Sequence, residues 1–204
     1  LAGIEKADDK TLSLNLKVSY KSQYIELLED RTVRDLFMEK DIDQEILGLE
    51  LKRQLELEQL YEQKISELSG GELQKVAVAY CLAKTADVYL IDEPSAFLDV
   101  EQRLAVSTAI KNVIIRTEKC AFVVDHDLLM LDYLSDRVLL FDGVCGKQGT
   151  AEKIADVQDA FNMFLSTEEL TFRQDPQTKR PRANKQDSQK DKEQKKENKY
   201  YYTI

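Results

Sequence analysis

The sequence has few of the residues that build metal and disulfide sites. Its 204 residues include three cysteines (Cys81, Cys120 and Cys145) and a single histidine. The cysteines lie far apart and no Cys-x-x-Cys pair occurs, so this chain by itself can build neither a zinc site nor an iron–sulfur cluster. Sparse, unpaired cysteines are typical of a reducing compartment.

Long apolar runs are also missing. The apolar fraction is 43%, and the longest apolar stretches have the length of a strand, too short for a helix that crosses a membrane. The chain begins at Leu1, and no charged-then-apolar leader follows it, so we expect no signal peptide. From these absences we expect a soluble, cytoplasmic chain that is a piece of a longer protein.

Charge is unevenly distributed along the chain, whose net charge is −9. Residues 173–199 carry ten Lys or Arg and five Asp or Glu, a local charge of +5 that leaves −14 for residues 1–172. Apolar residues become rare after Phe172, and residues 183–199 are almost entirely polar. We therefore expect residues 173–204 to form a basic, partly disordered extension that would meet any anionic partner.

The rest of the chain alternates between two patterns. Residues 11–19 place Leu12, Leu14, Leu16 and Val18 at every second position, which predicts a strand with these residues on its buried face. Residues 24–66 contain almost no glycine or proline and many Leu, Glu, Gln and Lys, which predicts helices.

Three short apolar runs follow, at 87–92, 120–125 and 137–141, separated by segments with helical spacing at 101–116 and 128–134. Apolar strands without alternation, separated by helices, are typical of a parallel sheet covered on both faces. The pattern predicts an α/β fold with three such strands.

Ser69, Gly70, Gly71 and Glu72 open a predicted helix that begins after Leu68. A hydroxyl, two glycines and free N–H groups at a helix N-terminus favour an anion, and the glycines let a phosphate approach the backbone. Alone, this pattern is weak evidence for an anion site, and an ordinary serine cap preceded by a turn is the better interpretation.

The run 87–92 ends in two adjacent carboxylates, Asp92 and Glu93, followed by Pro94. At the carboxyl edge of a parallel sheet the first acid can hold Mg²⁺ and the second can orient or deprotonate a water. His126 comes just after the next predicted strand, at the same edge, where it can hydrogen-bond a phosphate. Each group taken alone is more often structural.

In this order the motifs resemble those of the ATP-binding cassette ATPases. LSGGE (68–72) resembles the signature, YLIDEP (89–94) the Walker B strand, SAFLD (95–99) the D-loop, VVDHD (123–127) the switch histidine, and Gln23 the Q-loop glutamine. The segments around these motifs, with Phe172-Arg173, Asp175-Pro176 and Arg180-Pro181-Arg182 in the extension, further resemble the second nucleotide-binding domain of subfamily E, a ribosome-recycling subfamily.

The resemblance implies a P-loop NTPase-type fold, with a mostly parallel sheet flanked by helices. It implies a partial nucleotide-binding domain at 1–172 that contains a helical subdomain at about 24–85. Three departures stand out: residues 39–66 differ from the family pattern, Ser22 stands where a proline is usual, and no GxxxxGK[ST] occurs. The N-terminal strands and the phosphate-binding loop are therefore expected to be absent from this chain.

In the family, two cassettes enclose two ATP molecules with Mg²⁺. The resemblance implies that the signature residues Ser69, Gly70, Gly71 and Glu72 contact ATP bound by the partner cassette, and that Asp99 lies at the interface between the cassettes. It implies a general base at Glu93, a γ-phosphate contact at His126, metal binding by Asp92 and Gln23, and a catalytic role for Gln23.

The implied partners are a second cassette in the same full-length chain, the small ribosomal subunit and translation factors, with no membrane. Iron–sulfur clusters would belong only to an N-terminal domain missing here. Arg173, Arg180 and Arg182 are candidate partner contacts, because arginines stiffened by neighbouring prolines can hold bidentate contacts. The alternatives are a noncatalytic module that binds the ribosome or a cassette, and the ATPase subunit of a transporter.

Overall fold

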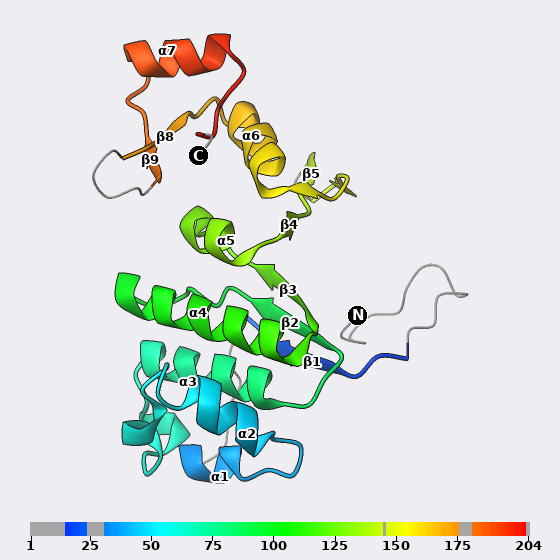
Figure 1. Ribbon diagram of the computed structural model, residues 1–204, viewed down its shortest axis with the longest axis vertical. Helices are drawn as coiled ribbons and strands as arrows, with labels where there is room; N and C mark the ends of the chain where they lie inside the picture. Colours follow the sequence, from blue (N-terminus) through cyan, green and yellow to red (C-terminus); the bar gives the residue numbers. More distant parts are fainter. Residues whose placement is uncertain (1–14, 24–30, 145, 176–180, 203–204) are drawn as a thin grey trace. The chain divides into compact units, whose positions relative to one another are not determined.

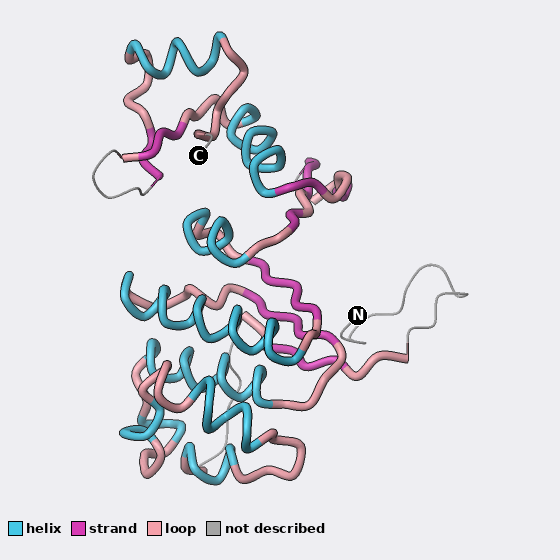
Figure 2. The backbone as a smooth tube through the Cα atoms, in the orientation of Figure 1, coloured by secondary structure: helices cyan, strands magenta, loops and turns pink. Residues whose placement is uncertain are grey.

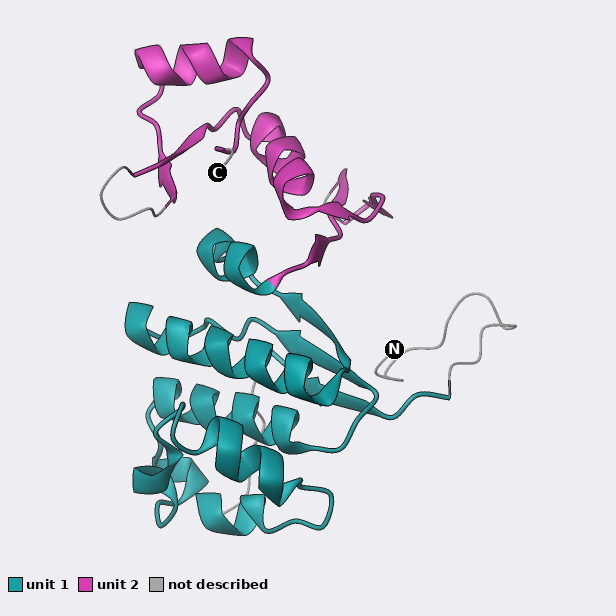
Figure 3. Cartoon of the chain, viewed as in Figure 1, with its two compact units in different colours: residues 1–134 teal, residues 135–204 magenta. Residues whose placement is uncertain are grey.

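The chain divides into two compact units, residues 1–134 and residues 135–204 (Figure 3). The computed structural model describes residues 15–23, 31–144, 146–175 and 181–202. Helix α6 (Val157–Thr167) contacts β4 and β7 of the second unit and groups with them. The domain boundary that we placed at residue 172 from the sequence differs from this grouping and stays a prediction.

The first unit is built on a parallel sheet of three strands, shown in Figure 2. Their order is β1 (Val18–Lys21), β2 (Val88–Asp92) and β3 (Cys120–Val124). Val88 lies opposite both Val18 and Cys120, so the three strands begin level and their carboxyl ends meet at one edge. This confirms the parallel α/β arrangement for the runs at 87–92 and 120–125.

Two long helices lie side by side on one side of this sheet (Figure 1). They are α3 (Gly70–Ala83) and α4 (Val100–Thr117), and α5 (Leu128–Leu134) packs against α4. Shorter helical segments lie around α3. Three of them contact it, namely α1 (Val33–Phe37), a π-helical turn (Leu47–Leu51) and a 3₁₀ turn (Leu57–Leu60). The short helix α2 (Gln44–Ile46) contacts the π-helical turn, and a second 3₁₀ turn (Ile65–Glu67) precedes α3 in the chain. Their leucines and isoleucines join the apolar residues of α3 and α4 in one core, so the helical interpretation of this segment is confirmed from residue 31 onward.

The alternating pattern of β1 misidentified its buried face. Leu16 and Tyr20 are 42% and 43% exposed, whereas Ser19 and Lys21 are each 4% exposed and lie on the inner face. The inner face accepts these polar residues because their hydrogen bonds are made: the Ser19 hydroxyl donates to the Cys81 carbonyl at 2.8 Å. The first two leucines of the pattern lie outside the described residues.

Cover on both faces of the sheet was also expected, and within the described part of the first unit it is found on one face only. Tyr20, Leu90 and Phe122 lie opposite one another in register and share the other face. Phe122 and Val124 are 49% and 59% exposed, so β3 is not the buried strand that its composition predicted.

The strands of the second unit form short antiparallel pairs. β4 (Arg137–Val138) pairs with β7 (Ala155–Asp156), and β5 (Phe141–Val144) pairs with β6 (Gln148–Ala151). The prediction of a third parallel strand over 137–141 was therefore wrong. A short connection lets the end of this run fold back as a hairpin, a local pairing that competes with a distant sheet.

The basic extension is ordered where the structure describes it. β8 (Phe172–Gln174) pairs with β9 (Pro181–Ala183), and Ser188 caps helix α7 (Gln189–Lys196). Within 183–199, where composition favours loose order, polar side chains bond one another and neighbouring segments, and the expectation of partial disorder over 173–204 stays a prediction. No helix in the described ranges has both the length and the apolar composition to cross a membrane.

Candidate functional site

The carboxyl edge of the sheet brings the predicted catalytic residues together. Glu93 follows β2, and His126 follows β3, its neighbour in the sheet. His126 Nε2 lies 3.1 Å from Glu93 Oε1, while the two side chains are 87% and 23% exposed. The imidazole thus lies on the solvent side of a half-buried carboxylate, where both can reach a bound phosphate or water.

Asp92 ends β2 beside this pair and is half-buried. Within the described residues its carboxylate has no hydrogen-bond or ion-pair partner, so both oxygens remain available to a ligand. Mg²⁺ is usually bound through one or two carboxylates together with substrate phosphates. The donor set therefore fits magnesium, and no group of three or more acidic, cysteine or histidine side chains in the described ranges offers a closed metal cage.

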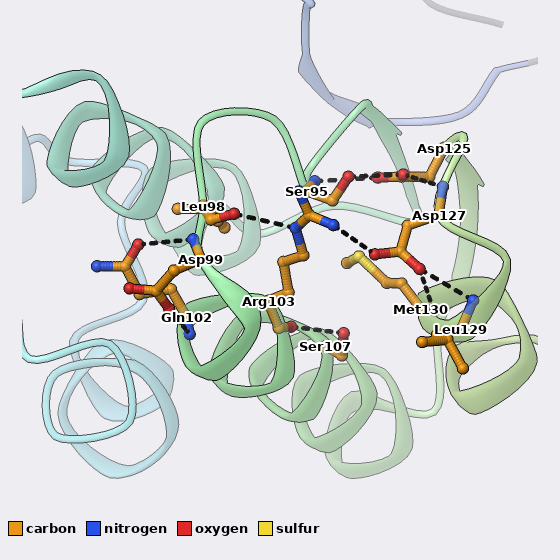
Figure 4. Close-up of polar contacts among 10 residues, drawn as sticks. All are labelled: Ser95, Leu98, Asp99, Gln102, Arg103, Ser107, Asp125, Asp127, Leu129 and Met130. Atoms are coloured by element: carbon orange, nitrogen blue, oxygen red, sulfur yellow. Dashed lines mark hydrogen bonds and ion pairs between the residues drawn. The ribbon is translucent and has the colours of Figure 1, made fainter. Parts of the chain in front are cut away.

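Polar contacts join the segment after Glu93 to the segment around His126 (Figure 4). The Ser95 backbone N–H and hydroxyl both donate to the Asp125 carboxylate, at 2.9 and 2.7 Å. The Asp127 carboxylate accepts the N–H groups of Leu129 and Met130 at 2.9 and 3.2 Å, which caps α5. The acids on either side of His126 therefore fix its loop.

Arg103 connects that loop to the start of α4 (Figure 4). Its Nη1 donates to Asp127 at 2.8 Å, and its Nε donates to the Leu98 carbonyl at 3.0 Å. Asp99 begins α4 through reciprocal bonds with Gln102, in which Asp99 Oδ1 accepts the Gln102 N–H at 2.9 Å. The residue predicted at a cassette interface is thus one residue from a carbonyl that is tied to the histidine loop.

The signature residues form the N-terminus of α3 as predicted. Ser69 and Glu72 cap it reciprocally: the Ser69 hydroxyl donates to Glu72 Oε2 at 2.6 Å, and Ser69 Oγ accepts the Glu72 N–H. The Ser69 hydroxyl and the Ser69 backbone N–H both donate to the Glu72 carboxylate and hold its pKa below the usual value. The glycines also serve packing, because a Cβ on Gly71 would lie 3.1 Å from the Phe97 carbonyl oxygen.

The other predicted residues are placed separately. Gln23 lies in an exposed bend two residues beyond β1, at the same edge of the sheet. Arg173 donates to Asn184 at 2.8 Å, and Arg182 forms a 3.1 Å ion pair with Asp175, all within the second unit. Arg180 lies outside the described residues.

Several residues of the site escaped the sequence analysis. Lys21 and Gln74 donate to backbone carbonyls at the end of β2, and Arg103 and Asp125 organise the loops around His126. Lys21 gave no clear signal, because it ends a strand, Val-Ser-Tyr-Lys, that is not otherwise apolar. Gln74 gave none, because a glutamine in a helix looks like a surface residue.

The chain is similar to known proteins in both sequence and structure. The ABC transporter family model matches residues 2–96. An uncharacterised ABC transporter ATP-binding protein of Methanocaldococcus jannaschii is 48% identical over 99% of this chain, and translation initiation factor RLI1 of Saccharomyces cerevisiae is 42% identical over 99%; each match covers 34% of the relative.

The structure shows the same similarity. The archaeal ribosome recycling factor aABCE1, solved in complex with the ribosomal stalk protein aP1, superposes with a TM-score of 0.89 and 46% identity over 99% of this chain and 40% of that one. The chain spans about a third of the length of the curated relatives it matches. With the order of the motifs and their meeting at the sheet edge, these findings identify an ABC transporter family match at residues 2–96 and make the whole chain similar to a third of an ATP-binding cassette protein.

Proposed function

We propose that this chain supplies the signature, Walker B, D-loop and switch-histidine elements of a cassette that hydrolyses ATP in ribosome recycling. The observation that carries the proposal is the meeting of Glu93 and His126, 3.1 Å apart, beside Asp92, whose carboxylate has no partner in the part of the chain that the structure describes. A carboxylate that can bind Mg²⁺, a second carboxylate that can act as a base and an imidazole that can hydrogen-bond the phosphate lie at one sheet edge. This arrangement suits the transfer of a phosphoryl group to water.

In this proposal Glu93 accepts the proton of the attacking water. The Glu93 side chain is only 23% exposed, so the surrounding residues limit its movement at the sheet edge. His126 holds the terminal phosphate and Glu93 at the same time, so that the water lies between base and phosphorus. Asp92, with Gln23 across the edge, would hold Mg²⁺, which neutralises phosphate charge when it is bound.

Ser69, Gly70, Gly71 and Glu72 would bind the nucleotide of a partner cassette. The N–H groups that open α3 and the closely approachable glycines suit a phosphate. Asp99 opens α4 next to the exposed Phe97, whose side chain lies against Gly70. The signature and the predicted interface residue therefore belong to one surface, which a second cassette would cover.

The relatives support a ribosomal role. One is a translation initiation factor, and a similar structure is a recycling factor bound to a ribosomal stalk protein. On this basis closure of two cassettes around ATP would drive apart the ribosomal subunits in the cytoplasm, with the small subunit and translation factors as partners. Iron–sulfur clusters would require cysteines beyond the three in this chain.

The test is Glu93→Gln in the full-length protein. The amide keeps the shape of the side chain but accepts no proton, so multi-turnover hydrolysis should fall about 10²–10⁴-fold while ATP binding is retained. Wild-type turnover in this variant would refute the assigned base.

A second candidate is a noncatalytic module, favoured by the absence of GxxxxGK[ST] from these 204 residues. That loop supplies most backbone and lysine contacts to the phosphates. We expect this segment alone to bind ATP very weakly and to hydrolyse none. Calorimetric titration of the isolated segment checks this, and an affinity in the micromolar range would contradict it.

A further inference from the structure

The backbone at Glu93 has a conformation that residues with a side chain seldom take. Its φ is +44°, in the left-handed region, where the Cβ atom crowds the backbone and which glycine occupies freely. Such a conformation persists only where the surrounding structure holds it, and it concentrates at functional sites. What holds Glu93 therefore determines where its carboxylate lies.

Three elements hold it. The Glu93 N–H donates to the Val124 carbonyl of β3 at 2.7 Å. The Glu93 carbonyl accepts Gln74 Nε2 from α3 at 2.7 Å and Lys21 Nζ from β1 at 3.3 Å. Lys21 Nζ also donates to the Asp92 carbonyl at 2.6 Å. The main chain of both acids is thus fixed by two side chains from other elements.

Gln74 is completely buried, and its Oε1 has no hydrogen-bond partner among the described residues. An unpaired buried acceptor destabilises the fold, and an apolar side chain of similar size would avoid it. In the described residues the hydrogen bond of this amide goes to the Glu93 carbonyl, so Gln74 contributes a polar contact that an apolar side chain would lack.

Lys21 is buried as well, at 4% exposure. Burial lowers its pKa, an effect opposed by the nearby carboxylates of Asp92, Glu93 and Asp125. A buried ammonium is costly unless its donors are used, and these donors point to the carbonyls of the two acids.

We propose that Gln74 is a positioning residue for Glu93, with Lys21 as a second holder of the same backbone. Gln74 lies two residues after Glu72 in the helix that the signature opens. One rigid helix therefore carries both the signature residues and the side chain that fixes the general base. This inference rests on the proposed function, because it takes Glu93 as the base.

The test uses Gln74→Met in the full-length protein, with steady-state ATP hydrolysis and a melting curve. Methionine keeps the length of the side chain but donates no hydrogen bond. We expect kcat to fall by roughly 10- to 100-fold, as for a misplaced catalytic group, while KM changes by less than about twofold.

Tyr80→Phe is the matched control, since it removes one hydrogen bond from the same helix, to Glu39, and leaves Glu93 untouched. Its kcat should equal that of the wild type. An unchanged kcat in Gln74→Met overturns the proposal, and so does a loss of rate matched by a proportional rise in KM.

If Gln74→Met does not fold, Gln74→Asn replaces it, because the shorter amide cannot reach the Glu93 carbonyl. The same loss of kcat is expected, and an unchanged kcat overturns the proposal. Glu93→Gln in the same assay separates the two ideas. If it is inactive while both Gln74 variants are normal, only the positioning role fails; if it turns over normally, the proposed function fails first.

Discussion

The sheet edge of the first unit leaves acidic groups available, whereas the C-terminal segment pairs its buried acid with several neighbours. Among the described residues, the Asp92 carboxylate has no hydrogen-bond or ion-pair partner, and the Glu93 carboxylate has only an exposed imidazole. Asp191 instead accepts from the Thr171 hydroxyl at 2.6 Å and the Asp187 N–H at 3.0 Å, and pairs with Lys195 at 3.1 Å. Unpaired acids suit a ligand, and a fully bonded acid suits a structural role.

Among the variants that test this contrast, Gly71→Asp should have the largest effect on ATP-dependent compaction and hydrolysis. The new Cβ would lie 3.1 Å from the Phe97 carbonyl, and its carboxylate would repel the phosphate of a partner nucleotide. ATP-dependent compaction, measured by interdomain fluorescence transfer in the full-length protein, should be lost together with hydrolysis. Gly48→Asp is the control, since a Cβ at exposed Gly48 meets no atom within 4 Å. Normal compaction in Gly71→Asp would remove the signature from the site.

A smaller loss of hydrolysis rate is expected from Arg103→Met, which removes the hydrogen bonds that join the Leu98 carbonyl to Asp127. His126 then sits in a loop that is no longer tied to the start of α4, and kcat should fall about tenfold. Arg116→Met is the control on the same helix, because its ion pairs with Glu45 and Glu50 lie away from the histidine loop. Equal rates in the two variants would show that the link is only structural.

The C-terminal segment should respond in stability rather than in hydrolysis. The Thr171 hydroxyl and the Lys195 ammonium hold the pKa of Asp191 below its usual value of 3.8. A depressed pKa in the folded state stabilises the fold at neutral pH, and this contribution is lost as the pH falls through that pKa.

Asp191→Asn should therefore lower the melting temperature at pH 7 and flatten its decline below about pH 4. Thermal melts followed by circular dichroism across a pH series measure both effects. Asp159→Asn, at an exposed position of α6, serves as the control. Identical melting of Asp191→Asn and wild type at pH 7 would refute the structural role of this cluster.

The smallest effect belongs to Arg182→Ala. Its ion pair with Asp175 is largely exposed on the arginine side, so its removal should cost at most about 1 kcal/mol. The salt dependence of binding to small ribosomal subunits should stay unchanged, because the arginine is engaged with a carboxylate. A phosphate contact would instead flatten the log–log salt slope by roughly 0.7–0.9 when it is lost.

The sequence predicted the parts of the site that depend on strand ends and helix starts. Asp92 and His126 follow apolar runs, and in a parallel sheet the ends of such runs meet. The cap at Ser69 was readable for the same reason, since it depends on residues only three positions apart. Contacts between neighbours in sequence, or at a shared edge, leave a pattern in the chain.

Long-range polar packing left no such pattern. The alternation in β1 favoured the even-numbered apolar residues as its inner face, whereas Ser19 and Lys21 lie there because distant carbonyls satisfy them. The order of the 183–199 segment depends on bonds such as Asn184 to Thr171, which composition cannot reveal. In β1 and in residues 183–199 alike, hydrogen-bond partners from other parts of the chain determine the structure.

The most direct measurement is the double variant Glu93→Gln with His126→Ala, compared with each single variant in single-turnover ATP hydrolysis by the full-length protein. Groups that act together on one reacting centre lose their effect together. The double variant should therefore hydrolyse ATP no more slowly than the slower single variant. Losses that multiply would show that the two side chains act independently, and would contradict a shared catalytic site at the sheet edge.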